Sequence, residues 1–162
     1  MEGHGMVVGK KASDFELSDH KGGKVRLYDA LKVSPVLLIF YPGDFKPVCT
    51  RQLCNYRDNM EHFTDYGVQL FGISENESGK HGEFAEKFDF PFLLLTDPGH
   101  QVAKAFGCTT LLMLGRPSRA VFIVNSKGII LYRYVEPTTI TRRSAEELVK
   151  ILGDLKQHNL LA

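Results

Sequence analysis

Apolar residues recur along the chain in two patterns, short unbroken runs and helical spacings. Short apolar runs bounded by proline, glycine or polar residues are typical of buried strands, and such runs occur at residues 36–41 (VLLIFY), 68–73 and 92–95. Apolar residues at steps of three or four predict helices over residues 49–66 and 83–88. Strands that alternate with helices indicate an α/β domain with a mixed sheet.

Turn and capping signals complete this pattern at both ends of the chain. Tight turns predict two hairpins, an N-terminal one and one near the C-terminus, whose strands are expected at residues 15–17, 25–27, 119–124 and 128–135. Asp97 before Pro98 is typical of the start of a short helix. Ser144 followed three residues later by Glu147 is a capping-box pattern, which predicts the start of the last helix.

Composition favours a globular protein and excludes several other classes. The 162 residues fit one domain over residues 1–162, and 20 basic residues face 19 acidic ones. This balance gives no general electrostatic reason to bind nucleic acid. No apolar run approaches the roughly 20 residues that cross a bilayer, so no membrane partner is expected. The first eight residues lack the pattern of a secretory signal, which favours a cytosolic location.

Candidate chemistry centres on Cys49, where a buried strand leads through a loop with two prolines into a helix. A cysteine in the first turn of a helix lies near unpaired N–H groups and a partial positive charge, which favour the reactive thiolate. A buried, inert cysteine is the alternative. The six histidines show no ligand spacing with one another, and His81 is expected to be a solvated helix residue. Neither a metal nor a cofactor is expected.

Cys54 lies five residues after Cys49 in the predicted helix. On an intact helix that spacing separates two residues by about 7.5 Å along the axis and about 140° around it. A disulfide requires Cα atoms about 4.4–6.8 Å apart, so the two cysteines pair only if the first helical turns unwind. Two unrelated thiols remain the alternative. The third cysteine, Cys108, is expected to be a small apolar residue without a redox role.

The segment FYPGDFKPVCTRQLC resembles the active-site segment of peroxiredoxins, the alkyl hydroperoxide reductase and thiol-specific antioxidant family. Pro42 and Cys49 match the family pattern Pro-x3-Thr/Ser-x2-Cys. Cys54 matches the second cysteine of the bacterioferritin-comigratory, or Q-type, branch. Further similarity at residues 8–17, 71–74 and 118–124 extends the resemblance over nearly the whole chain. The resemblance implies a thioredoxin-like fold with an N-terminal hairpin extension.

The resemblance also implies an activity and a role for each site residue. Cys49 would attack hydrogen peroxide or an organic hydroperoxide and become a sulfenic acid, and Cys54 would resolve it as an intramolecular disulfide. Arg119 would hold the thiolate and the peroxide, Pro42 would shape the pocket, and backbone N–H groups of Val48 and Cys49 would stabilise the leaving oxyanion. A thioredoxin-like protein would be the reductant, and the chain would be a monomer or a weak homodimer.

Lys46 departs from the family pattern, because it stands where the pattern has Thr or Ser. An ammonium group can donate hydrogen bonds to a peroxide but cannot accept one, so Lys46 either takes part in substrate binding or points into solvent and leaves the peroxidase impaired. Arg116 is an alternative to Arg119 as the partner of Cys49. A thiol–disulfide oxidoreductase of the same fold and a non-catalytic scaffold also remain open.

Overall fold

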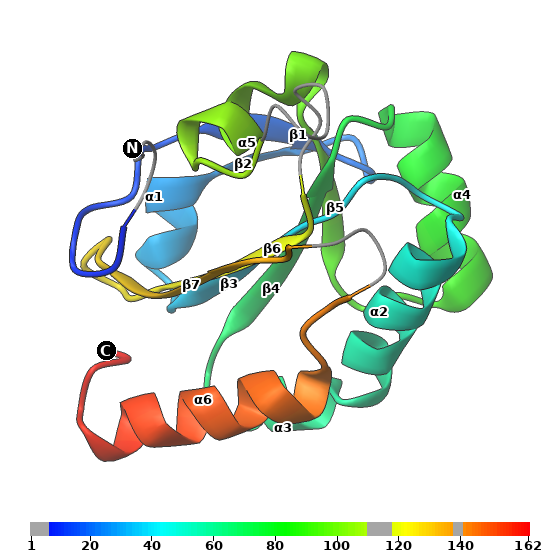
Figure 1. Ribbon diagram of the computed structural model, residues 1–162. Helices are drawn as coiled ribbons and strands as arrows, with labels where there is room; N and C mark the ends of the chain where they lie inside the picture. The colour runs from blue at the N-terminus through cyan, green and yellow to red at the C-terminus, as the bar shows by residue number, and fades with distance from the viewer. Residues whose placement is uncertain (1–6, 110–117, 138–140) are drawn as a thin grey trace.

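A seven-stranded mixed sheet forms the centre of the protein in the computed structural model, which describes residues 7–109, 118–137 and 141–162 (Figure 1). The strand order is β2-β1-β5-β4-β3-β6-β7, in which β3, β4 and β5 run parallel and the remaining pairs are antiparallel. The strands are β1 Glu16–Asp19, β2 Lys24–Arg26, β3 Val36–Phe40, β4 Gln69–Ser74, β5 Leu93–Thr96, β6 Ala120–Val124 and β7 Ile130–Val135.

Helices cover both faces of this sheet, so the architecture is the predicted α/β class. α1 and α5 pack on one face, and α2, α3, α4 and α6 pack on the other (Figure 1). The helices are α1 Leu27–Leu31, α2 Pro47–Asp58, α3 Met60–Asp65, α4 Ser78–Phe88, the short 3₁₀ helix η1 Pro98–His100, α5 Gln101–Ala105 and α6 Ala145–Gln157.

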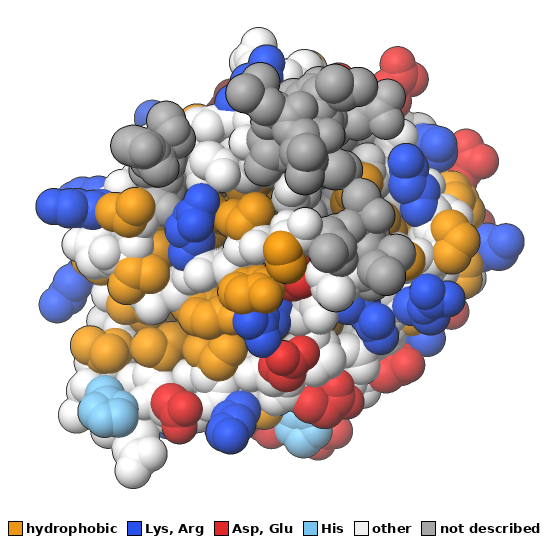
Figure 2. Space-filling view, in the orientation of Figure 1, with side chains coloured by type: hydrophobic (Ala, Val, Ile, Leu, Met, Phe, Trp, Pro, Cys, Tyr) orange, Lys and Arg blue, Asp and Glu red, His pale blue; other side chains and the backbone are white. Residues whose placement is uncertain are grey.

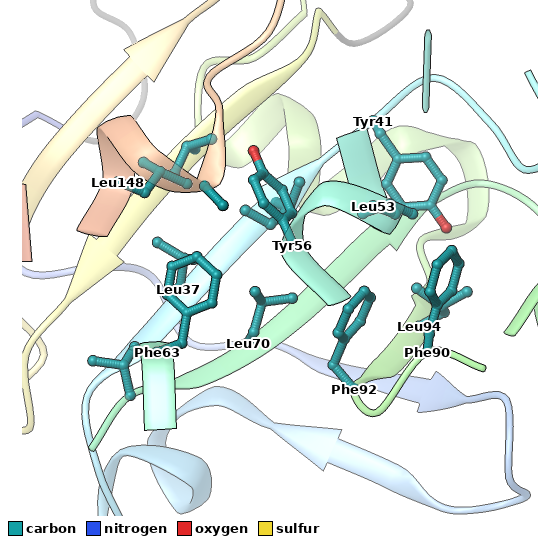
Figure 3. Packing of buried hydrophobic residues seen from close by; sticks show 14 of the residues in the cluster. Leu37, Tyr41, Leu53, Tyr56, Phe63, Leu70, Phe90, Phe92, Leu94 and Leu148 are labelled. Carbon is teal, nitrogen blue, oxygen red and sulfur yellow. The ribbon is translucent and has the colours of Figure 1, made fainter. Parts of the chain in front are cut away.

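The central strand β3 is buried on both faces because its side chains alternate between two apolar cores. Leu37 and Ile39 pack with α2, α3 and α6 (Figure 3), whereas Leu38 and Phe40 pack with α1 and α5. Successive side chains of a strand point to opposite faces, so a continuous apolar run is what a strand covered on both sides requires. This packing fixes the end of β3, from which the candidate site begins.

Most predicted elements are confirmed, and the differences have local causes. The helix expected over residues 49–66 is two helices, because the backbone leaves helical geometry at Asn59. α1, which is only five residues long, was not predicted from the sequence. Asp97 does begin a helical segment, but its carboxylate accepts from the amides of Val102 and Ala103 and therefore caps α5. The capping box of Ser144 and Glu147 is confirmed.

The surface in the view of Figure 2 carries acidic and basic side chains side by side along its lower edge, in keeping with the near-neutral net charge of +1. Among the helices of the described residues, none is long and apolar enough to cross a membrane.

Candidate active site

Cys49 and Arg119, 70 positions apart in the chain, are in direct contact: Nη1 of Arg119 donates a hydrogen bond to Sγ of Cys49 at 2.8 Å. The sheet brings them together. β3 and β6 are antiparallel neighbours, with Phe40 opposite Ala120. The end of β3, which leads into the cysteine loop, therefore lies beside the start of β6, which Arg119 precedes. A guanidinium at hydrogen-bond distance favours the thiolate form of a cysteine.

Cys49 lies in the first turn of α2, as the sequence predicts. Lys46 is the N-cap and Pro47 the first helical residue, a position that suits proline because the first amides of a helix have no partner within it. The N–H groups of Val48 and Cys49 belong to this turn, whereas the N–H of Thr50 already donates to the carbonyl of Lys46 at 2.8 Å. The thiol sulfur thus lies at the positive end of the helix dipole.

Both members of the Cys49–Arg119 contact are shielded from water. Cys49 has 0% of its surface exposed and Arg119 has 5%. A charge-assisted hydrogen bond is stronger in such surroundings than in water. Because the Cys49 side chain has no exposed surface, a peroxide reaches the sulfur only when neighbouring side chains move.

The remaining residues of the predicted site differ in exposure. Pro42 and Val48 are half-buried at the two ends of the cysteine loop. Lys46 is exposed, and its stem lies over Gly43, where a Cβ would be 3.1 Å from its Cε. Within the described ranges no hydrogen bond or ion pair joins its ammonium group to another residue. Lys46 therefore takes the solvent-facing position that the sequence analysis left open.

Cys54 is half-buried on α2, and neither it nor Cys49 is in a disulfide. The helix between them is continuous, so the two residues are separated by the spacing of an intact helix. Burial and the nearby carboxylate of Asp58 raise the pKa of the Cys54 thiol above its ordinary value, and Arg57 opposes that shift. A direct bond between Cys49 and Cys54 requires the first turns of α2 to unwind.

Gln52 and Tyr56 hold α2 against the segment that precedes α6, through hydrogen bonds that were not predicted from the sequence. Both side chains have no exposed surface. Nε2 of Gln52 donates to the hydroxyl of Tyr56 at 2.8 Å, and that hydroxyl donates to the carbonyl of Arg143 at 2.6 Å. Burial raises the pKa of Tyr56 well above its ordinary range. The spacing of four residues on α2 is the one signal for this pair in the sequence.

His81 is not solvated, which corrects the prediction from the sequence. Its side chain has no exposed surface, and Nδ1 lies 2.6 Å from Oδ2 of Asp44. The same carboxylate accepts a hydrogen bond from the hydroxyl of Tyr41 at 2.6 Å. Burial and the Asp44 carboxylate raise the pKa of Tyr41 well above its ordinary value. The prediction failed because His81 stands beside exposed Glu83 in the sequence, and the helix turns the two side chains to different faces.

The other candidates lie apart from the site or outside the described residues. Cys108 is fully buried in the core around α1 and α5, and burial raises the pKa of its thiol far above the ordinary range. This agrees with the expected apolar role. Arg116, the alternative partner of Cys49, lies outside the described residues. The described ranges contain no group of three His, Cys, Asp or Glu side chains that could hold a metal ion.

The chain is similar in sequence to one protein family over most of its length. The AhpC/TSA family model matches residues 8–133. Chloroplastic peroxiredoxin Q of Triticum aestivum is 37% identical over 135 residues, which are 80% of this chain and 62% of that protein. Peroxiredoxin Bcp of Bacillus subtilis is 36% identical over 129 residues, which are 76% of this chain and 82% of that protein.

The crystal structure of peroxidoxin BcpB from Mycobacterium tuberculosis matches with a TM-score of 0.81 at 32% identity, over 94% of this chain and 97% of that one. This match confirms the thioredoxin-like fold, and the names Q and Bcp agree with the branch that the cysteine segment resembles. The wheat relative is chloroplastic and the Bacillus relative bacterial, so the relatives do not support one compartment. The cytosolic location stays a prediction.

Proposed function

This chain belongs to the AhpC/TSA family, and on that premise we propose that it is a thiol-dependent peroxidase that reduces hydrogen peroxide and organic hydroperoxides. The observation that carries the proposal is the 2.8 Å contact between Nη1 of Arg119 and Sγ of Cys49 at the start of α2. Burying a guanidinium costs desolvation energy, so its placement against the Cys49 sulfur supports a function of that thiol beyond packing.

In the first step the Cys49 thiolate attacks one oxygen of the peroxide. A sulfur–oxygen bond forms, the O–O bond breaks, and its electron pair leaves with the second oxygen as hydroxide or alkoxide, which takes up a proton. The sulfur is oxidised to the sulfenic acid and the peroxide is reduced to water or an alcohol. Arg119 and the first amides of α2 are suited to stabilise the charge that develops on the leaving oxygen.

In the second step Cys54 is the resolving cysteine. Its thiolate attacks the Cys49 sulfenic acid, a disulfide forms, and the oxygen leaves as water. Because the intact helix separates the two residues, this step follows unwinding of the first turns of α2. A thioredoxin-like dithiol then reduces the disulfide by exchange. The first step requires the folded helix and the second the unwound one, so the cycle alternates between two conformations.

Peroxide consumption with dithiothreitol as reductant tests the proposal. Cys49→Ser is expected to abolish consumption. Cys54→Ser in the absence of reductant is expected to consume one equivalent and stop, with a sulfenic acid trapped at Cys49. Cys108→Ala is the control, since it removes a thiol from the opposite core and is expected to leave both the rate and the stoichiometry unchanged.

Consumption that persists in the Cys49→Ser variant would overturn the proposal. An insulin-reduction assay without peroxide separates the alternative thiol–disulfide oxidoreductase, for which insulin reduction would be fast while peroxide reduction would be slow.

A further inference from the structure

A buried polar network links the loop before α2 to the end of β3, to α4 and to β5. Asp44 lies in that loop and is 3% exposed. Its carboxylate accepts from Tyr41 at the end of β3 and contacts His81 of α4, each at 2.6 Å. The backbone N–H of Asp44 donates to Oδ1 of Asn76 at 2.7 Å. Nε2 of His81 lies 3.1 Å from the carbonyl oxygen of Leu95 in β5.

The partners of His81 fix how many protons its pair with Asp44 holds. Nε2 faces a carbonyl oxygen, which only accepts, so Nε2 carries a hydrogen. Nδ1 faces a carboxylate oxygen at 2.6 Å, and an unprotonated ring nitrogen would also be an acceptor, so a hydrogen lies between them. Whether that hydrogen rests on nitrogen or on oxygen, the buried pair has no net charge. Removing His81 would leave the Asp44 carboxylate buried without this partner, which is costly.

Apolar contacts bind the same loop to the same face of α4. Phe45, the residue after Asp44, adopts φ 65°, a conformation that a bulky residue rarely takes. In that conformation its ring packs 4.9 Å from the ring of Phe84. Phe84 lies three residues after His81, so the two share one face of α4. The face of α4 therefore holds two successive loop residues, one by a polar contact and one by an aromatic contact.

We propose that His81 is a positioning residue that, through Asp44, holds the loop before α2 and sets how readily the first turns of α2 unwind. The loop ends at Lys46, whose carbonyl accepts the N–H and the hydroxyl of Thr50 in the first turn. Release of Asp44 frees this turn, and Asp44 regains water as it leaves. Loss of His81 therefore shifts α2 toward its unwound form.

The consequence for catalysis rests on the proposed peroxidase function. While α2 is folded, the Cys49 sulfenate stays beside Arg119, where a second peroxide that reaches it adds one oxygen to give the sulfinate and leaves as water or an alcohol. Once α2 has unwound, Cys54 attacks the sulfenic acid instead, and water leaves. His81 thus sets the ratio of overoxidation to disulfide formation. Its loss lowers that ratio and also slows the first step, because the thiolate is less often held against Arg119.

Amide hydrogen exchange of the reduced protein tests the positioning role without relying on activity. In His81→Leu the amides of residues 50–54 are expected to exchange roughly tenfold faster than in the wild type, which is the effect of losing a charge-assisted hydrogen bond. His81→Asn keeps a donor toward Asp44 and is expected to restore much of the protection. Glu83→Ala, on the exposed side of α4, is the matched control. Amides of α6 report global unfolding and are expected to stay unchanged.

A double-mutant cycle tests whether His81 acts through Asp44. If it does, His81→Leu has little further effect on the exchange of residues 50–54 in an Asp44→Asn background, because the carboxylate that His81 contacts has been removed. Equal effects in both backgrounds would overturn the coupling. Unchanged exchange of residues 50–54 in the single His81→Leu variant would overturn the positioning role itself.

The catalytic consequence is measured by mass spectrometry during turnover with hydrogen peroxide and dithiothreitol. His81→Leu is expected to show roughly tenfold less sulfinate at Cys49 per turnover than the wild type, with slower formation of the sulfenic acid. Slowing of both the first step and disulfide formation would instead indicate general damage and contradict the proposal. A wild-type protein that forms no Cys49–Cys54 disulfide would refute the proposed function and leave the exchange result standing.

Discussion

At the scale of single residues, the contact between Arg119 and Cys49 distinguishes this thiol from the other two cysteines. Cys54 and Cys108 both have thiols whose pKa is raised by burial, which disfavours their thiolates. Cys49 is also buried, but a guanidinium donates to its sulfur at 2.8 Å. Reactivity of a cysteine follows from such an electropositive environment rather than from exposure alone.

Replacing Arg119 by methionine is expected to lower the rate constant for oxidation of Cys49 about a hundredfold, the usual effect of losing a donor aimed at developing charge. Stopped-flow measurement of hydrogen peroxide consumption in a single turnover gives this constant. Arg51→Met, an exposed arginine on the same helix, is the matched control and should leave it unchanged. A similar loss in both variants would show that net charge, not the contact with sulfur, matters.

Lys46→Thr is expected to increase the same rate constant several-fold. The exposed lysine has no contact of its ammonium group with another described residue, whereas a threonine hydroxyl can both donate and accept near the first turn of α2. The assay is again single-turnover peroxide consumption, with Lys80→Thr as control. A loss of rate on replacing Lys46 would mean that the lysine takes part in binding the peroxide.

At the scale of elements, α2 has two tasks that conflict. When its first turn is folded, Cys49 lies at the helix N-terminus, where the thiolate is favoured. The folded helix also places Cys54 about 7.5 Å further along the axis, too far for a disulfide. The hydroxyl of Tyr56 accepts from Gln52 and donates to the carbonyl of Arg143, which fixes the later part of the helix. The turns before Tyr56, which include Gln52, can therefore open while Tyr56 keeps the later part of α2 packed.

Oxidation by one equivalent of hydrogen peroxide is expected to lower the helix signal in far-ultraviolet circular dichroism by no more than the two turns between Pro47 and Cys54. Dithiothreitol should restore the signal. Cys54→Ser supplies the control, because it can form the sulfenic acid but not the disulfide, and its signal should stay constant. A wild-type signal that is unaffected by disulfide formation would contradict the need for unwinding.

The sequence predicts most elements because each carries a local signal. The buried strands, the hairpin turns and the capping box of Ser144 each depend on residues that are close together in the chain. The short helix α1 has no such periodicity over its five residues, and the break at Asn59 has no proline or glycine to mark it. Local patterns therefore give element types more reliably than element ends.

At the scale of the whole molecule, the sheet order determines which distant residues meet, and no local pattern contains that order. Arg119 was expected beside Cys49 from the family resemblance, and the pairing of β3 with β6 is the physical reason that they meet. The pair of His81 and Asp44 had no comparable signal, because a histidine beside a glutamate on a helix is usually exposed. Its burial arises from the packing of α4 against β5 and the loop that follows β3.

Two separate apolar cores lie on the two faces of the sheet, and the three cysteines differ in how easily a reagent in solvent reaches them. Cys108 lies in the core opposite to α2, and burial raises the pKa of its thiol. Iodoacetamide at pH 8 is therefore expected to label Cys54 in the native protein and to leave Cys108 unlabelled until global unfolding. Mass spectrometry of digested protein reports both sites, and full labelling in denaturant is the control. Labelling of Cys108 as fast as Cys54 would contradict the packing of that core.

The most direct measurement is the mass and disulfide map of the fully reduced protein after one equivalent of hydrogen peroxide. We expect the loss of two hydrogens and a disulfide-linked peptide pair that contains Cys49 and Cys54, with Cys108 still a free thiol. An unchanged mass, or a first oxidation at Cys54 or Cys108 while Cys49 remains reduced, would contradict the claim that the sulfur held by Arg119 is the one that attacks peroxide.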